Sequence, residues 1–252
     1  MNHSRAVLMD IDGTLLDSAE AQAQSWLRVL QDFGYPVKYG QVRARIGMGQ
    51  DRLLRELCGL SEDSPRARRM LLVREQLLRS HYLPTVSLLP HVRDFLDRLQ
   101  KEGREVLIAT SASRSETMAL LGHARLLTDF DHVVCKEDAA ETKPASDVVC
   151  AALDRAGVRP ENAIFVASSP YDLAAAHAAH VPSVALRSGR WPDSALLDAS
   201  DIYDDLGQLL VQFGSSPLAA DAAAPAIPKS IVWREPALWP TSAANLKKPH
   251  AA

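Results

Sequence analysis

The sequence has few cysteines, little net charge and no long hydrophobic run. Its three cysteines, Cys58, Cys135 and Cys150, form no CxxC pair, which argues against a disulfide framework and a zinc cluster. We therefore expect three buried, small hydrophobic side chains in a reducing compartment. The formal charge of −3, with both signs interspersed, gives no basic face for nucleic acid. A small-molecule partner fits this composition better.

A membrane role is also not indicated. No stretch of the 252 residues approaches the length of a membrane span, and the start MNHSRAVLMD lacks the charged and long apolar regions of a signal peptide. These observations predict a cytoplasmic protein without a membrane partner. The length is sufficient for one large domain or two small ones with a real core, and the sequence does not indicate an oligomeric state.

Short apolar runs typical of buried strands alternate with helical patterns along most of the chain. The expected strands are 5–10, 104–109, 131–135, 163–167 and 182–186, and the expected helices are 91–103, 113–123, 145–157 and 170–180. This alternation predicts an α/β fold, a Rossmann-like doubly wound parallel sheet with helices on both faces. Ligands of such sheets gather at the carboxyl ends of the strands, so the residues that follow each strand matter most.

Two segments break the alternation. Residues 17–84 are almost wholly helical in pattern and predict a helical insertion into an α/β core formed by 1–16 and 85–213. From residue 214 onward, Ala, Pro and Ser dominate, which predicts a disordered tail over 214–252. Trp233 and Trp239 lie in this tail and would dock on the body or on a partner, because exposed tryptophans are costly.

The strongest local signal is MDIDGTLLDS at 9–18, in which two carboxylates follow an apolar run. A turn at Gly13 lets Asp10 and Asp12 converge on one ligand. A calcium loop of the EF-hand type requires Gly at its sixth position and Glu at its twelfth. Counted from Asp10, this chain has Gly13 fourth and Ala21 twelfth, so the calcium reading fails.

DIDGTLLDS resembles the first motif of the haloacid dehalogenase superfamily in its phosphatase form. ATSAS at 109–113 resembles the second motif, ETKPASD at 141–147 the third, and the helical insertion lies where such enzymes carry an α-helical cap. The chain is similar to the phosphoglycolate phosphatase and β-phosphoglucomutase-like branch over residues 5–213. Four motifs in order at strand ends are much more specific than one DxDG.

The resemblance implies a phosphoryl-transfer mechanism and assigns roles to these residues. Asp10 would attack phosphorus and form an aspartyl-phosphate, while Asp12 would protonate the leaving group and later deprotonate the water. Lys143 would neutralise the phosphate and Asp10, and Ser111 would donate to a phosphate oxygen. Thr110 is the alternative to Ser111 if the register differs by one. Taken alone, Lys143 could be a solvated loop lysine and Ser111 a turn former.

The same resemblance implies Mg²⁺ as the cofactor, held by the Asp10 carboxylate, the Asp12 carbonyl and a fourth-motif acid. The fourth motif, VASSPYDLAAAHAAH at 166–180, departs from the family pattern of Gly-Asp-Ser-x-x-Asp. Ser168 replaces the first aspartate, which weakens the expected metal site. Asp172 lies one helical turn further on and is the candidate substitute ligand, directly or through water.

The leading hypothesis is therefore a Mg²⁺-dependent phosphatase of a small phosphorylated metabolite with a weakened metal site. A non-catalytic member that binds a phosphorylated ligand or a protein is the rival, and a phosphomutase is a third option. Substrate contacts are expected in the cap loop IGMGQDR at 46–52. There Gly47 and Gly49 permit close approach and Arg52 could meet an anion, although the loop could also be a simple turn between helices.

Overall fold

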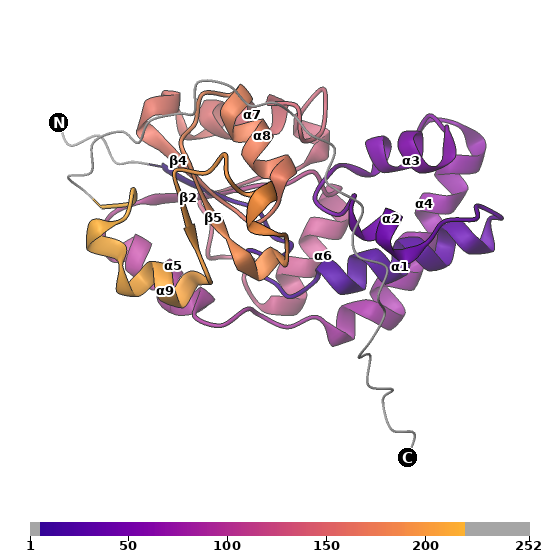
Figure 1. Cartoon of the computed structure of the whole chain (residues 1–252), viewed down its shortest axis with the longest axis horizontal. Helices are drawn as coiled ribbons and strands as arrows, with labels where there is room; N and C mark the ends of the chain where they lie inside the picture. Colours follow the sequence, from indigo (N-terminus) through magenta and orange to yellow (C-terminus); the bar gives the residue numbers. More distant parts are fainter. Residues whose placement is uncertain (1–5, 220–252) are drawn as a thin grey trace, which may run out of the picture.

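The computed structural model describes residues 6–219, and its centre is a six-stranded parallel sheet (Figure 1). The strands, in the order β3-β2-β1-β4-β5-β6, are β1 Ala6–Met9, β2 Glu105–Ala109, β3 His132–Val134, β4 Ala163–Ala167, β5 Ser183–Leu186 and β6 Asp201–Tyr203. Every pairing is parallel. The predicted α/β Rossmann-like class is confirmed, and only the short edge strand β6 was not predicted.

Helices cover both faces of the sheet, because successive strand residues point to opposite sides. The helices of this part are α5 Val92–Lys101, α6 Arg114–Ala124, α7 Asp147–Ala156, α8 Pro170–Ala178 and α9 Leu206–Val211. In β1, Val7 and Met9 belong to a core cluster that includes residues of α5 and α9, whereas Ala6 and Leu8 belong to a second cluster with residues of α7 and α8. The expected helices at 91–103, 113–123, 145–157 and 170–180 are thus confirmed.

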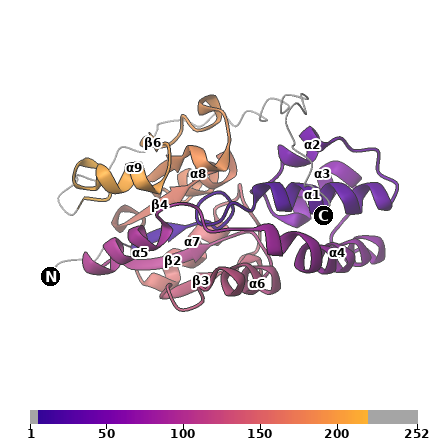
Figure 2. The same cartoon turned by 90° about the horizontal axis from the view of Figure 1, so that it is seen from below.

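A second group of helices lies beyond one end of the sheet (Figures 1 and 2). It consists of α1 Ala19–Asp32, α2 Tyr39–Arg43, α3 Gln50–Cys58 and α4 Pro65–Leu77, followed by a π-helical turn at Leu78–Tyr82. These helices have their own apolar cluster, in which Trp26, Leu30 and Met70 are buried. The cluster contains no sheet residue, so this group has an independent small core. We propose that it is the cap predicted over 17–84.

Short 3-10 turns complete the chain at Leu83–Thr85, Lys136–Asp138, Pro160–Asn162, Arg187–Gly189, Asp193–Ala195 and Phe213–Ser215. Phe213 and Leu218 are buried in the same cluster as α5 and α9, so packed structure extends past residue 214, where the tail was predicted to begin. The remainder of that predicted tail, with Trp233 and Trp239, lies outside the described residues. Within residues 6–219, no helix has both the length and the apolarity to cross a bilayer.

The prediction of three buried cysteines is wrong in part. Cys135 is buried behind β3, but Cys58 is only partly buried and Cys150 is exposed. Cys58 is the last residue of α3 and Cys150 lies on the outer side of α7, so apolar neighbours do not fully cover either side chain. Composition alone does not reveal which face of a helix a cysteine takes.

Candidate active site

The carboxyl ends of three neighbouring strands bring the predicted residues together. Asp10 follows β1, Thr110 and Ser111 follow β2, and Ser168 follows β4. Because β1 lies between β2 and β4 in the sheet, these side chains meet at one edge. Lys143 reaches the same edge from the loop between β3 and α7. The sequence motifs, far apart along the chain, therefore form one site.

Lys143 forms the buried centre of this site. Its ammonium donates to Asp10 Oδ1 at 2.9 Å and to Asp172 Oδ1 at 2.7 Å, and its side chain is 0% exposed. A buried ammonium requires such partners, since an isolated charge in the interior is very costly. The alternative of a solvated loop lysine is therefore wrong. The lysine places a fixed positive charge against Asp10.

Asp10 is buried, and its environment shifts its protonation. Burial raises the pKa of Asp10 to about 7, against the opposing effect of Lys143 and with the help of the negative charges of Asp172 and Asp12. The carboxyl is therefore partly protonated near neutral pH. Only the ionised form has the electron pair that a nucleophile needs.

This pKa predicts an acid limb in the pH profile. If Asp10 must be ionised, kcat/KM falls as pH drops below about 7, by roughly tenfold per pH unit. The measurement is kcat/KM for a phosphate monoester between about pH 5 and about pH 8. An ordinary aspartate would keep full activity down to about pH 5, and a profile flat over that range would contradict the assignment of Asp10 as an ionised nucleophile.

Asp12 lies two residues beyond Asp10 in the chain, and its side chain points toward the helical group. Its carboxylate accepts hydrogen bonds from the Ser18 hydroxyl and from Gln22 Nε2, the latter at 3.2 and 3.3 Å. Burial, followed by the negative charge of Glu116, raises the pKa of Asp12. A raised pKa favours the protonated form, which is the form a general acid needs. Gly13, at φ 76°, makes the turn that directly follows Asp12.

Thr110 and Ser111 are buried at the end of β2, and both line the pocket beside Asp10. Ser111 Oγ accepts from the backbone N–H of Lys143 at 2.9 Å, and its own hydroxyl hydrogen remains available to a ligand. Thr110 Oγ1 accepts from the backbone N–H of Ala112 at 3.2 Å. Both hydroxyls therefore have one local contact and can each donate one further hydrogen bond.

Ser168 and Asp172 make contacts that a metal ligand would have to give up. Ser168 Oγ donates to the backbone carbonyl of Asp12 at 2.8 Å, the same oxygen that the resemblance assigns to Mg²⁺. Asp172 Oδ2 accepts from the N–H groups of Ser168 and Ser169 and from the Ser169 hydroxyl, while Oδ1 accepts from Lys143. Asp172 thus caps its own helix and neutralises Lys143, rather than facing Asp10 as a substitute ligand.

The residues present do not fit the expected magnesium site. Mg²⁺ prefers charged oxygens in octahedral geometry, and here the carboxylates of Asp10 and Asp172 are both paired with the Lys143 ammonium. Among residues 6–219, no three His, Cys, Asp or Glu side chains are grouped as metal ligands. Ser168 supplies a neutral hydroxyl already bonded to the carbonyl. The chemistry proposed below is therefore derived from the chain's own groups.

The neutral Ser168 at this position predicts the effect of restoring the aspartate of the family pattern. In Ser168→Asp, a carboxylate would face the Asp12 carbonyl, which is repulsive unless a cation lies between them. We expect Mg²⁺ to raise the unfolding free energy of this variant by roughly 1.5–3 kcal/mol more than that of the wild type. The measurement is the thermal midpoint as a function of MgCl₂ concentration. Ser168→Asn is the uncharged control, and equal responses of all three proteins would contradict the prediction.

The predicted cap-loop residues lie close to the core, but they do not all face the pocket. Gly47 lines the pocket at φ 107°, and a Cβ there would meet Ser169 Oγ at 2.8 Å. A Cβ at Gly49 would meet Thr142 Oγ1 at 2.1 Å. These glycines are thus required by contact with the protein's own core. Arg52 pairs with Glu141 and donates to the Thr142 carbonyl at 3.2 Å, so it joins the helical group to the core outside the pocket.

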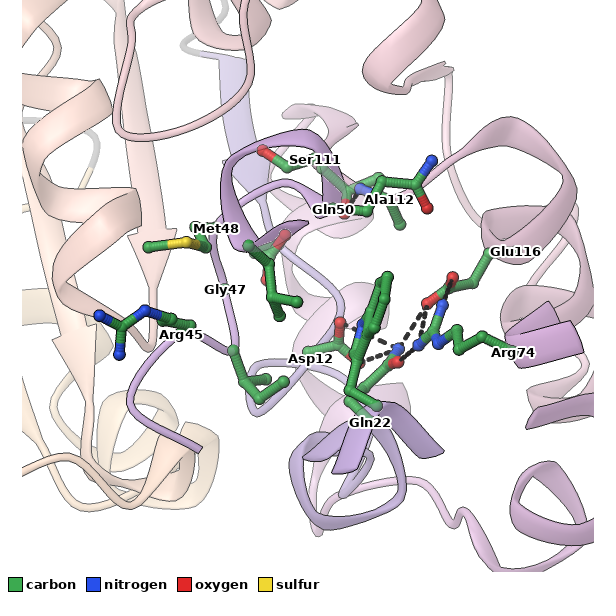
Figure 3. A pocket seen from close by; sticks show the side chains of 15 residues that line it. Asp12, Gln22, Arg45, Gly47, Met48, Gln50, Arg74, Ser111, Ala112 and Glu116 are labelled. Carbon is green, nitrogen blue, oxygen red and sulfur yellow. Dashed lines mark hydrogen bonds and ion pairs between the residues drawn. The ribbon is translucent and has the colours of Figure 1, made fainter. Parts of the chain in front are cut away.

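A pocket that is partly open to solvent lies between the strand ends and the helical group (Figure 3). Its lining includes Asp10, Asp12 and Ser111 on the core side. It also includes residues that the motifs did not indicate: Gln22, Trp26 and Arg74 of the helical group, and Glu116 of α6. Figure 3 shows Gln22 between Asp12 and the Arg74–Glu116 pair. Gln22 and Glu116 closely follow the first and second motifs along the chain, whereas no motif lies near Arg74.

Comparisons with known proteins identify relatives of this chain. A family model described as haloacid dehalogenase-like hydrolase matches residues 7–186. The chain is 30% identical over 216 residues to a phosphoglycolate phosphatase of Pseudomonas putida, with 82% of this chain and 78% of that protein covered. It is also 30% identical over 240 residues to a phosphoglycolate phosphatase of Salmonella typhimurium, with 85% and 94% covered.

Solved structures share the fold. A hydrolase from Pseudomonas syringae superposes with a TM-score of 0.78 at 24% identity, covering 84% of this chain and 99% of that one. A β-phosphoglucomutase from Clostridium difficile gives 0.74 at 17% identity, covering 84% and 96%. The chain belongs to the haloacid dehalogenase-like hydrolase family. Within that family it is a hydrolase of the phosphatase type.

Proposed function

We propose that this protein hydrolyses phosphate monoesters of small metabolites, with Asp10 as the nucleophile and Asp12 as the general acid and base. The observation that carries this proposal is that Asp10, Asp12 and Ser111 line one pocket, while the buried Lys143 ammonium contacts the Asp10 carboxylate. Positioning and charge neutralisation of this kind are what phosphoryl transfer requires.

In the first step an oxygen of Asp10 forms a bond to phosphorus as the bond to the leaving oxygen breaks. Asp12, whose pKa is raised, gives its proton to that leaving oxygen. Lys143 and the Ser111 hydroxyl offset the charge on the transferred phosphoryl oxygens. In the second step Asp12 takes a proton from water, the water oxygen bonds to phosphorus, and the bond to Asp10 breaks.

The substrate is proposed only by class. The curated relatives that align with the chain carry the name phosphoglycolate phosphatase, which makes 2-phosphoglycolate the first compound to test. Mg²⁺ dependence is the expectation from the family, and the contacts of Ser168 argue for a weaker dependence than a complete acid set would give. The cytoplasm, which holds such metabolites, is the proposed location.

The test is release of inorganic phosphate from a panel of phosphorylated metabolites, with Mg²⁺ and with a chelator. We expect turnover of at least one monoester. If no compound is hydrolysed but some bind, the non-catalytic alternative replaces this proposal, and the hydrogen bond from Ser168 to the Asp12 carbonyl is the observation that favours it. If a sugar phosphate is converted to its isomer without phosphate release, the protein is a phosphomutase.

A further inference from the structure

The pocket contains a buried ion pair that the proposed chemistry does not use. Arg74 of α4 pairs with Glu116 of α6, and their side chains are only 4% and 8% exposed. Arg74 also donates to the Gln22 amide oxygen and, at 3.2 Å, to Ser25 Oγ, and its guanidinium lies 5.0 Å from the centre of the Trp26 ring. The guanidinium is therefore held on every side by groups of the chain.

This pair lies on the side of the pocket that faces the leaving group. Gln22 Nε2 donates to both oxygens of Asp12 and, at 2.7 Å, to Glu116 Oε1 (Figure 3). One amide group thus separates the proposed acid from the Glu116 carboxylate. Since Asp12 must touch the leaving oxygen, the rest of the leaving group extends toward Gln22, Glu116 and Trp26.

The charges on that side are already balanced by the protein. The cations among the described lining residues are Arg45 and Arg74, and each is bonded to a carboxylate of the chain, Glu56 and Glu116 respectively. A carboxylate on the leaving group would have to lie beside the Glu116 carboxylate or displace it from Arg74. Like charges brought together in a partly desolvated site are strongly unfavourable.

We propose that Glu116 determines specificity by occupying Arg74, so that the pocket selects phosphate monoesters with an uncharged, hydroxyl-bearing leaving group and rejects those with a carboxylate. This inference rests on the proposed function. A hydroxyl can donate to the Glu116 carboxylate, which is an acceptor only, and a short carbon chain can pack on Trp26. The relatives named phosphoglycolate phosphatase act, by that name, on a substrate with a carboxylate, so the proposal separates this chain from them.

The test compares two substrates that differ in one group. In 2-hydroxyethyl phosphate, a hydroxymethyl group replaces the carboxylate of 2-phosphoglycolate. For the wild-type full chain we expect kcat/KM to favour 2-hydroxyethyl phosphate by at least roughly tenfold. In Glu116→Gln, which keeps the shape of the side chain but frees the Arg74 charge, we expect the ratio of the two values to move toward 2-phosphoglycolate by at least roughly tenfold.

The double variant Arg74→Gln/Glu116→Gln is the matched control, because it removes both charges and should show no gain for 2-phosphoglycolate. A purely structural ion pair would change both substrates equally in Glu116→Gln, and that result overturns the proposal. A wild type that prefers 2-phosphoglycolate overturns it too, even if Glu116→Gln does not fold. If the wild type hydrolyses neither compound, the panel of phosphorylated metabolites described above tests the proposed function separately. In that case calorimetric titration with both compounds tests the specificity inference. An unchanged ratio of the two Kd values between wild type and Glu116→Gln overturns it.

Discussion

Asp10→Asn will abolish phosphate release, with a loss in kcat of at least about 10⁴-fold, while the fold is retained. The amide has no ionised oxygen and cannot form the bond to phosphorus. It has nearly the same shape as the carboxyl, and its carbonyl oxygen can still accept from Lys143, which lies 2.9 Å from Asp10 Oδ1. The measurement is steady-state phosphate release by the purified variant, with circular dichroism as the check on folding.

Asp32→Asn is the matched control for this result. Asp32 ends α1 and forms an exposed ion pair with Arg28 at 2.8 Å, far from the strand ends, so its loss should leave turnover within about twofold of the wild type. Turnover by Asp10→Asn at a rate close to that of the wild type would remove Asp10 from the role of nucleophile. The site would then need another group to attack phosphorus.

Lys143→Met will lower the unfolding free energy by about 3–5 kcal/mol near neutral pH. The lysine is fully buried between Asp10 and Asp172, and without it two carboxylates lie in the interior with no cation between them. Without the opposing effect of the lysine, burial and the negative charge of Asp172 would raise the pKa of Asp10 further. Since a raised pKa favours the proton-bound folded state, the stability loss should be larger at about pH 8 than at about pH 5. Urea unfolding at both pH values measures it.

Two variants make this prediction specific. Lys136→Met removes a lysine that pairs with Glu62 at 2.6 Å nearer the surface, and it should cost no more than about 1 kcal/mol. Lys143→Met/Asp172→Asn removes one of the two buried charges together with the lysine and should recover part of the loss. A cost for Lys143→Met as small as that for Lys136→Met would show that the buried charges are not coupled as the contacts indicate.

The sequence predicted the core of the site because that part depends on local patterns and on a general rule of parallel sheets. Asp10 and Ser111 follow apolar runs, and Lys143 lies in the loop after a third run. The carboxyl ends of neighbouring parallel strands meet at one edge of the sheet. The strands β1 to β5 were indicated by continuous apolar runs. The sixth, Asp201–Tyr203, has only three residues and begins with an exposed aspartate, so no such run marks it.

The opposite side of the pocket could not be predicted in the same way. Gln22, Arg74 and Glu116 lie on three different helices, and their contacts depend on how the helical group packs on the core. Helical periodicity indicates which face of a helix is buried, but not which distant polar group it meets. For the same reason, the sequence suggested an anionic ligand as the partner of Arg52, whereas the structure pairs it with Glu141. It suggested a metal as the partner of Asp172, whereas the structure pairs it with Lys143.

The most direct measurement of the central claim is mass spectrometry of the acid-quenched enzyme during turnover of a hydrolysed monoester. An aspartyl-phosphate at Asp10 is the species that distinguishes covalent catalysis from direct attack by water. The account predicts that the peptide containing Asp10 carries one added phosphoryl group in the wild type, and that this group is absent in Asp10→Asn. A wild type that turns over the monoester while that peptide stays unmodified, or a phosphoryl group on a different residue, would contradict the account.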